Sequence, residues 1–228
     1  MILWKIFNKL QKIKNKIKNL FSKKISFDTI KNNNRIFLYA GDVPNMPQYG
    51  EFIGLSLTQN NKNHIKHDIT NKHKLTDNSV DIYQAEDVFE HIEYDSLLNV
   101  INDIYRILKP NGIFRLSVPD YVFDYFYNRC QKNSNGEILF DPGGGGKYLN
   151  GKVIEGGHLW FPNYKLVSDL LKKTNFKKIK FYHYYDENKK AIINPIDYKI
   201  GYIQRTPDND ERGKNPYRPM SIVVDCIK

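Results

Sequence analysis

Residues 80–120 constrain the fold of this chain more than any other segment does. Val80, Ile82 and Tyr83 predict a short apolar strand. A helix with one apolar face is predicted next, because apolar residues recur at three- and four-residue steps: Leu97, Leu98, Ile101, Ile104, Tyr105 and Leu108. Residues 109–112, Lys-Pro-Asn-Gly, predict its end, since proline cannot continue a helix and Asn-Gly accepts left-handed backbone. Residues 113–118 then predict a second strand.

This strand-helix-strand unit also predicts where a ligand binds. Two strands joined by a crossover helix run parallel, and open parallel sheets bind ligands at the carboxyl ends of their strands. Ala85 and Glu86 follow the first strand, and Asp120 follows the second. We therefore expect these residues to lie along one rim of the sheet.

Similar patterns along the chain predict the rest of the sheet. Further strands are expected at 35–40, 52–57, 64–69, 179–182 and 221–227, and further helices at 121–129 and 164–173. The last strand should pair antiparallel beside residues 179–182. The prediction is an α/β, Rossmann-like sheet of about seven strands, mostly parallel with an antiparallel last strand, with helices on both faces.

The chain divides into an appendage and one domain. Its 228 residues suffice for one sizeable core. Residues 1–30 are predicted to form a basic amphipathic helix, and residues 35–228 the folded domain. Within the domain we expect an insertion at about 125–160 and a long polar loop at about 206–219.

The positive charge of the chain belongs to its first residues. The net charge is +10, and residues 1–24 hold eight lysines and no acidic residue. The remainder is close to neutral, which disfavours nucleic acid as a partner of the domain. In residues 2–24 an apolar stripe faces the lysines, a pattern typical of a helix on an anionic membrane surface. A helix that docks on a partner protein, on nucleic acid or on the domain itself is the alternative.

Cysteine and histidine positions predict the compartment and disfavour a metal site. Cys130 and Cys226 make no disulfide framework, and the chain shows no secretory pattern, so we expect a cytoplasmic protein, peripheral at the cytoplasmic face of a membrane if residues 2–24 bind there. His64, His67 and His73 have no metal-ligand spacing, and no metal is predicted.

The amino-acid sequence of the central segment resembles that of a known family. The runs SVDIYQAEDVFEHI and IYRILKPNGIFRLSVPDY are similar to the central part of class I, Rossmann-like, S-adenosylmethionine (SAM)-dependent methyltransferases of the type-11 kind. That family has a Glu-His pair after an apolar strand, here Glu90-His91, and a helix ending R-x-L-K-P-x-G, here residues 106–112. The resemblance implies SAM as the cofactor and methyl transfer as the activity.

The resemblance also implies which residues contact the cofactor. The glycine-rich turn after the first strand corresponds to Ala40, Gly41 and Asp42, although it is degenerate and Tyr39 replaces its first glycine. After the second strand, where the family places an acidic residue for the ribose, this chain has Ser56, followed by Leu57.

The third and fourth strands complete the implied cofactor set. Asp68, followed by Ile69, corresponds to the acidic residue near the adenine amine, and Ala85 and Glu86 follow the fourth strand. The alternative for Asp68 is that it caps the following turn, because Asp-x-Thr is also turn chemistry.

Three residues are candidates for a catalytic base. An oxygen or nitrogen acceptor must lose its proton, most often to histidine or a carboxylate. His91 and Asp120 lie near the predicted rim, and His158 ends a glycine-rich insertion that could close as a lid. The alternatives are a structural role for His91 and helix capping for Asp120.

Two functions follow from these observations. The first is a SAM-dependent methyltransferase acting on a small molecule, glycan or lipid-linked sugar, held at a membrane surface. The second is a methyltransferase fold that has lost SAM and serves as a binding or scaffold module, which Tyr39 and Ser56 favour.

Overall fold

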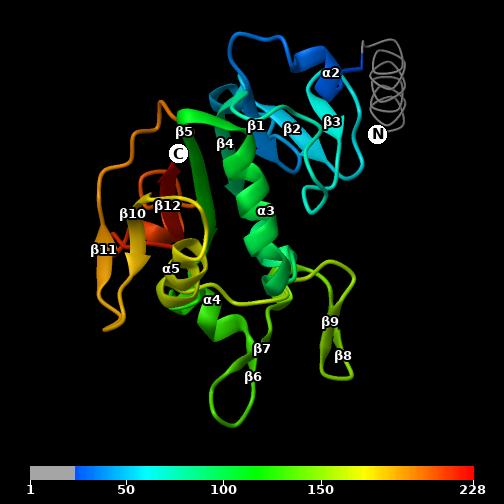
Figure 1. Ribbon diagram of the computed structural model, residues 1–228. Coiled ribbons are helices and arrows are strands. Elements are labelled where there is room, and N and C mark those ends of the chain that lie inside the picture. Colours follow the sequence, from blue (N-terminus) through cyan, green and yellow to red (C-terminus); the bar gives the residue numbers. More distant parts are fainter. Residues whose placement is uncertain (1–23) are drawn as a thin grey trace, which may run out of the picture.

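The computed structural model describes residues 24–228, and an eight-stranded sheet is the centre of this part (Figure 1). The strands lie in the order β11-β10-β12-β5-β4-β1-β2-β3. Their bounds are β1 Phe37–Ala40, β2 Ile53–Ser56, β3 His64–Lys66, β4 Val80–Glu86, β5 Leu108–Pro119, β10 Lys178–Tyr185, β11 Ala191–Ile193 and β12 Ser221–Ile227. Strands β1 to β5 are mutually parallel, whereas β12 runs antiparallel between β5 and β10. The predicted sheet is confirmed, and β11 is an additional strand at its edge.

Helices and two small hairpins surround the sheet. The helices are α2 Phe27–Ile30, α3 Tyr94–Ile107, α4 Asp124–Arg129 and α5 Tyr164–Lys172, with short 3-10 turns η1 Pro47–Tyr49, η2 Phe89–His91, η3 Pro142–Gly144 and η4 Glu211–Gly213. The hairpins pair β6 Gln131–Lys132 with β7 Ile138–Phe140, and β8 Lys147–Leu149 with β9 Lys152–Ile154. Both project from one end of the sheet, in the region expected to be an insertion (Figure 1).

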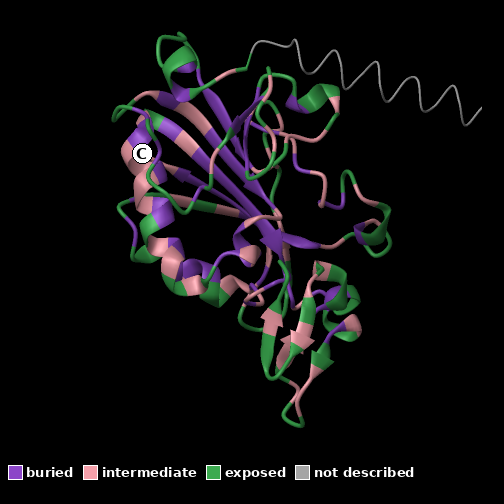
Figure 2. Ribbon diagram, turned by 90° about the vertical axis from the view of Figure 1, so that its right-hand side faces the viewer, coloured by how far each residue is buried: buried purple, intermediate pink, exposed green. Residues whose placement is uncertain are grey.

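The largest core lies between the sheet and the helices α2, α3 and α5. Helix α3 places Leu97, Ile101 and Ile104 in this core, as its periodicity predicts. The helix ends at Ile107, and Asn111 adopts the left-handed φ of 64° expected of the turn after it. Figure 2 shows the buried central strands on which these helices pack.

Helix α2 belongs to the packed domain. Phe27 and Ile30 are buried in the main core, so the domain begins before the expected boundary at residue 35. The ring of Phe27 also packs edge-on against the imidazole of His67, at 5.0 Å between ring centroids. The expected amphipathic helix otherwise falls on residues 1–23, which lie outside the described residues.

The second face of the sheet carries buried polar side chains beside two smaller aromatic and apolar clusters, and it is covered by an extended segment, residues 194–206, that we call the strap. Gln84, Glu86 and Arg115 point to this face and are buried. Each bonds the strap backbone: Gln84 Nε2 donates to the Tyr202 carbonyl at 2.7 Å, the Gln204 amide donates to Glu86 at 2.7 Å, and Arg115 donates to the Gly201 carbonyl at 2.6 Å. The sheet therefore positions the strap through side chains.

Tyr39, which replaces the first glycine of the implied turn, also points to this second face. Its ring is 4 % exposed and packs edge-on against Tyr49, at 5.6 Å between centroids, and against Phe52 at 6.1 Å. Neighbouring residues of a strand point to opposite faces, so Leu38 and Ala40 enter the main core instead. Tyr39 therefore leaves the space above the carboxyl end of β1 free.

Candidate functional site

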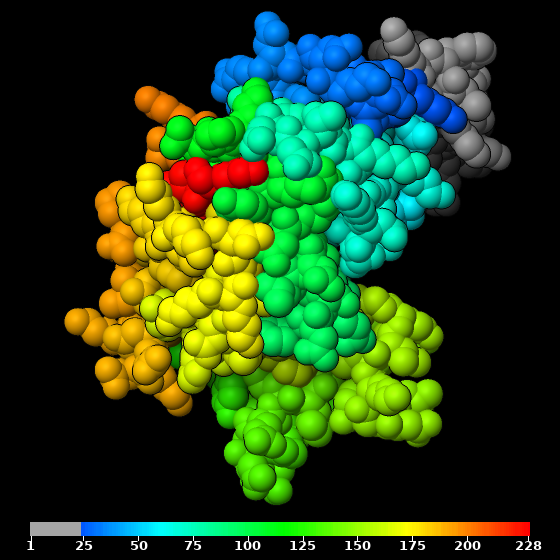
Figure 3. Space-filling view, viewed as in Figure 1, coloured from blue at the N-terminus to red at the C-terminus, as the bar shows by residue number. Residues whose placement is uncertain are grey.

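A cavity of about 430 Å³ opens at the carboxyl ends of β1 to β4, and we call it the rim cavity. Its lining includes Gly41, Leu57, Asp68, Ile69, His91 and Leu159. The space-filling view shows the hollow between the cyan residues that follow β2 and the lime-green insertion (Figure 3). This is the edge at which parallel sheets bind ligands.

A tight turn at Gly41 forms the floor of the rim cavity. Gly41 has a φ of +87°, a conformation that glycine adopts without strain, and its amide donates to the Leu55 carbonyl at 2.9 Å. Beneath it, Gly54 has no room for a side chain, because a Cβ there would lie 2.3 Å from the His64 ring. His64 Nε2 in turn accepts from the Val43 amide at 3.0 Å. One glycine of the implied motif thus suffices to bring bare backbone to the cavity.

Four of the nine implied cofactor residues line this cavity: Gly41, Leu57, Asp68 and Ile69. Leu57 is 65 % exposed, which is unusual for a large apolar side chain and leaves it free to contact a ligand. Asp68 accepts from the amide and the hydroxyl of Thr70, at 2.9 and 2.7 Å. Asp68 therefore caps its turn and lines the cavity at once, so the two interpretations of this residue are compatible.

The other five implied cofactor residues lie outside the lining of the rim cavity. Ala40 and Ala85 are buried in the main core, and Glu86 lies under the strap. Ser56 is 1 % exposed, and its hydroxyl accepts from the amides of Thr58 and Gln59, at 3.1 and 2.8 Å. Asp42 follows the Gly41 turn and is outside the lining. A buried hydroxyl that already caps a turn does not face a ribose.

Asp120 lies apart from the other two catalytic candidates. It is fully buried, and its carboxylate accepts from the amides of Val122 and Tyr185, both at 3.0 Å. Burial raises the pKa of Asp120 to about 6, although these two bonds oppose the shift. Since α4 begins at Asp124, Asp120 is not its N-cap; it joins the end of β5 to β10.

His91 and His158 come together, and Glu90 joins them. The two imidazole rings lie 4.6 Å apart between centroids, nearly perpendicular. One nitrogen of each ring and one carboxylate oxygen of Glu90 lie within 4.8 Å of one another. We call these three residues the triad. Glu90 is a site residue that was not among the candidates expected from the sequence, although its position beside His91 in the Glu-His pair was a usable signal.

A chain of buried polar groups holds His158. Its Nδ1 bonds the hydroxyl of Tyr121, which bonds Asp141, which pairs with Arg129 at 2.6 Å. Burial lowers the pKa of His158 to about 3, so its imidazole is neutral. Gly144 lies against the ring, where a Cβ would be 2.5 Å from it. The glycine-rich run thus makes room for His158.

Two hydrogen bonds tie the segment that carries His158 to the turn that carries Glu90 and His91. The Leu159 amide donates to the Glu90 carbonyl at 2.8 Å, and Trp160 Nε1 donates to the Phe89 carbonyl at 2.9 Å. The triad is therefore assembled from β4–η2 on one side and the end of the insertion on the other.

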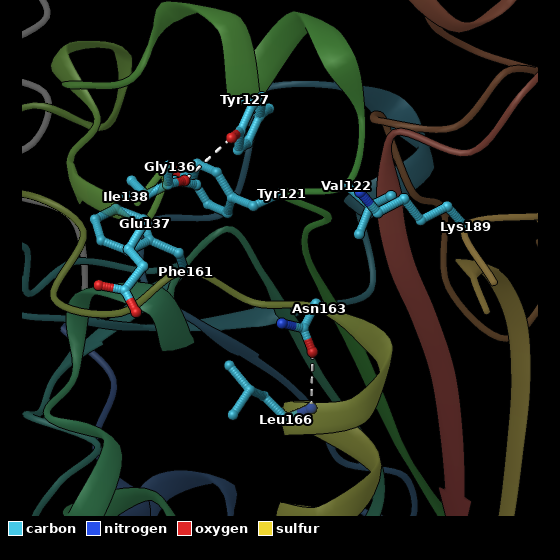
Figure 4. Close-up of a pocket in the computed structure, with 10 residues that line it drawn as sticks. All are labelled: Tyr121, Val122, Tyr127, Gly136, Glu137, Ile138, Phe161, Asn163, Leu166 and Lys189. Atoms are coloured by element: carbon cyan, nitrogen blue, oxygen red, sulfur yellow. Dashed lines mark hydrogen bonds between the residues drawn. The ribbon is translucent and has the colours of Figure 1, made fainter. Parts of the chain in front are cut away.

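A second cavity, of about 670 Å³, lies between α4, the β6–β7 hairpin and α5, and we call it the groove (Figure 4). Tyr121, Tyr127 and Phe161 supply aromatic surface in its lining, and Lys189 supplies a cation. Tyr121 lines the groove and bonds His158, and His91 lines the rim cavity, so the triad lies between the linings of the two cavities.

Residues 48–116 match the family described as a methyltransferase domain, and they include β2 to β4, η2, α3 and most of β5. The matched segment is similar to a methyltransferase domain. This match agrees with the resemblance to SAM-dependent methyltransferases and bears out the enzyme class and the cofactor that the sequence predicts. No curated protein matches the chain.

Solved structures share the fold of this methyltransferase domain. A putative SAM-dependent methyltransferase from Listeria monocytogenes is 14 % identical, covers 89 % of this chain and 94 % of its own, and has a TM-score of 0.50. A SAM-dependent methyltransferase from Archaeoglobus fulgidus is 16 % identical, covers 89 % and 90 %, and has a TM-score of 0.49. Among residues 24–228, no helix is long and apolar enough to cross a bilayer.

The rim cavity fits SAM in size and in lining. Its volume falls within the range of small-molecule pockets, roughly 300–1,000 Å³. Bare backbone at Gly41 permits close approach, Leu57 and Ile69 offer apolar surface to an adenine, and Asp68 offers an acceptor to its amine. A residue other than Ser56 must contact the ribose hydroxyls.

Proposed function

We propose that the domain binds SAM in the rim cavity and transfers its methyl group to a hydroxyl or amine of an acceptor that enters from the groove. The observation that supports this most directly is the position of the triad between the linings of the two cavities, with His91 in the rim cavity and His158 bonded to Tyr121 of the groove. Methyl transfer requires alignment of donor and acceptor more than covalent help from the protein.

His91 is the proposed base. Its Nδ1 lies 2.8 Å from the Gly156 carbonyl, which can only accept, so Nδ1 carries the proton and Nε2 has a free lone pair. His91 lines the rim cavity, where SAM supplies an electrophilic methyl group when bound. The lone pair of Nε2 is thus available to take a proton from the acceptor, and the carbonyl of Gly156 stabilises the imidazolium that results.

The groove favours a small polar acceptor with an apolar face. Tyr127 and Phe161 can stack against a sugar ring, and the exposed loop that carries Lys189 adds positive charge. We therefore propose a small molecule, a glycan or a lipid-linked sugar as the acceptor class.

SAM binding is the first test of the function. Wild-type protein should bind SAM saturably in isothermal titration calorimetry, and Gly41→Val should bind it at least tenfold more weakly, because the new side chain fills the cavity floor. Gly145→Val is the matched control: its φ of +80° gives the same backbone strain, but nothing lies within 4 Å of its Cβ. It should bind SAM within about twofold of wild type. A folded wild-type protein that shows no heat at millimolar SAM would support the non-catalytic scaffold instead.

We also propose that residues 2–24 hold the enzyme at an anionic membrane surface on the cytoplasmic side. Each lysine near such a surface contributes about 1 kcal/mol. The full chain should float with phosphatidylserine-containing liposomes, and replacing Lys9, Lys12 and Lys16 by glutamate should abolish flotation. Equal flotation of both proteins, or of neither, would contradict a membrane role for this segment.

A further inference from the structure

Glu90 is a buried carboxylate whose charge nothing in residues 24–228 compensates directly. The side chain is fully buried, and neither of its oxygens has a hydrogen-bond partner among the described residues. Burying an unpaired carboxylate is costly, so such groups are normally paired, protonated or bound to a metal.

The nearby arginines are already engaged. Arg205 pairs with Asp87 at 3.0 Å, and Arg129 pairs with Asp141 at 2.6 Å. Each pair is neutral in sum. The carboxylate of Glu90 therefore has no cation of its own among the described residues.

The hydrogen-bond chain behind His158 fixes which of its nitrogens is free. Asp141 takes two bonds from Arg129 and can only accept, so the hydroxyl of Tyr121 must donate to it. Tyr121 then accepts from Nδ1–H of His158. The other nitrogen, Nε2, keeps a bare lone pair and lies 3.7 Å from Oε1 of Glu90.

A hydrogen bond also fixes which nitrogen of His91 carries the proton. Its Nδ1–H donates to the Gly156 carbonyl at 2.8 Å, which leaves Nε2 as its lone-pair nitrogen. The triad thus gathers two imidazole lone pairs and a carboxylate, which repel one another unless a cation lies among them.

We propose that Glu90, His91 and His158 bind a divalent first-row transition metal ion such as Zn²⁺, Co²⁺ or Fe²⁺. Two histidines and one carboxylate are a known ligand set for such ions. Atoms that lie about 2.1 Å from one metal are roughly 3.4 Å apart. One nitrogen of each ring and one oxygen of Glu90 now lie within 4.8 Å of one another, so they would close by up to about 1.4 Å on binding.

The surroundings of the triad are those of a metal site. Ligating histidines donate their second N–H to a carbonyl or to a carboxylate-linked group, as His91 does to Gly156 and His158 does through Tyr121 to Asp141. Three protein ligands leave coordination positions open, as in catalytic sites. If the proposed function holds, an acceptor oxygen from the groove would take one of them, and the bound ion, in place of the His91 lone pair, would promote the loss of its proton.

The experiment uses the full-length chain, with any affinity tag removed and the protein dialysed against a chelator. It is titrated with Co²⁺ and with Zn²⁺ in the absence of SAM, so its result is independent of the proposed function. Wild type should bind one equivalent, and Co²⁺ should give visible absorption bands. At a hundredfold excess of Zn²⁺ over the dissociation constant, the melting temperature should rise by about 5–10 °C.

Three variants make the test specific. Glu90→Gln and His158→Ala should each weaken binding at least tenfold and lose the absorption bands. His67→Gln is the matched control, because His67 and His73 form the other close histidine pair, 4.8 Å between ring centroids, and it should bind like wild type. Glu90→Gln should fold at least as well as the metal-free wild type, since it removes a buried charge.

Two outcomes would overturn the proposal. One is a wild-type protein without saturable binding, which means that Glu90 is buried as the neutral acid; burial does raise its pKa well above the usual range. The other is binding that survives Glu90→Gln and His158→Ala but fails in His67→Gln, which assigns the ion to the pair of His67 and His73.

Discussion

Replacing Arg115 by methionine should lower the free energy of unfolding by about 3–5 kcal/mol, because it leaves a buried carboxylate without its cation. Arg115 is fully buried on the polar face of the sheet and pairs with Asp225 through two bonds of 2.8 Å. It also donates to the carbonyls of Asp197 and Gly201 in the strap, at 2.8 and 2.6 Å. Urea denaturation followed by circular dichroism measures the effect.

A double variant separates the charge from the strap contacts. Arg115→Met with Asp225→Leu removes both charges and should recover more than half of the lost stability, since buried ion pairs can be replaced by apolar residues of similar volume. The strap carbonyls lose their donors in both proteins. If the double variant is as unstable as the single one, those carbonyl bonds and not the charge of Asp225 account for the loss.

Trp160→Ala should cost a similar amount, about 3–5 kcal/mol, because it empties a large buried site. Trp160 is 8 % exposed and packs against Tyr94 at 5.1 Å between ring centroids. Its indole N–H bonds the Phe89 carbonyl next to the triad, so the variant should also lose activity in excess of its loss of stability. Thermal melts and a methyl-transfer assay below the melting temperature measure the two effects.

Trp160→Phe is the control for this prediction. It keeps an aromatic ring beside Tyr94 but removes the donor to Phe89, so it should cost about 1–2 kcal/mol. Equal losses in the two variants would show that the hydrogen bond, and not the packing, is the main contribution of Trp160.

The central elements of the fold could be predicted because local chemistry determines them. The apolar stripe of Leu97, Ile101 and Ile104 defines both the helix and the face it buries. The Asn-Gly pair after it specifies the left-handed turn at Asn111. The strap could not be predicted in the same way. Its backbone is irregular, and side chains that are distant in the sequence, such as Gln84, hold it in place through hydrogen bonds.

The implied cofactor residues show that alignment with a family does not determine where a side chain points. Alignment with the family places Ser56 at the ribose, but hydrogen bonds to Thr58 and Gln59 keep its hydroxyl in the turn. His91 and His158 were both candidates from the sequence, but their meeting with Glu90 could not be predicted, for another reason. His158 meets Glu90 only because the insertion folds back onto η2, and nothing in the local sequence near either residue records that contact.

The sheet also ends in very short strands on both sides. The edge strands β3 and β11 contain three residues each, against a usual length of about five or six. Lys66 ends β3, and Lys189 and Lys190 precede β11. A strand from another molecule would find few backbone groups to pair with and a positive charge beside them. The short edge strands thus protect this wide sheet against edge-to-edge aggregation.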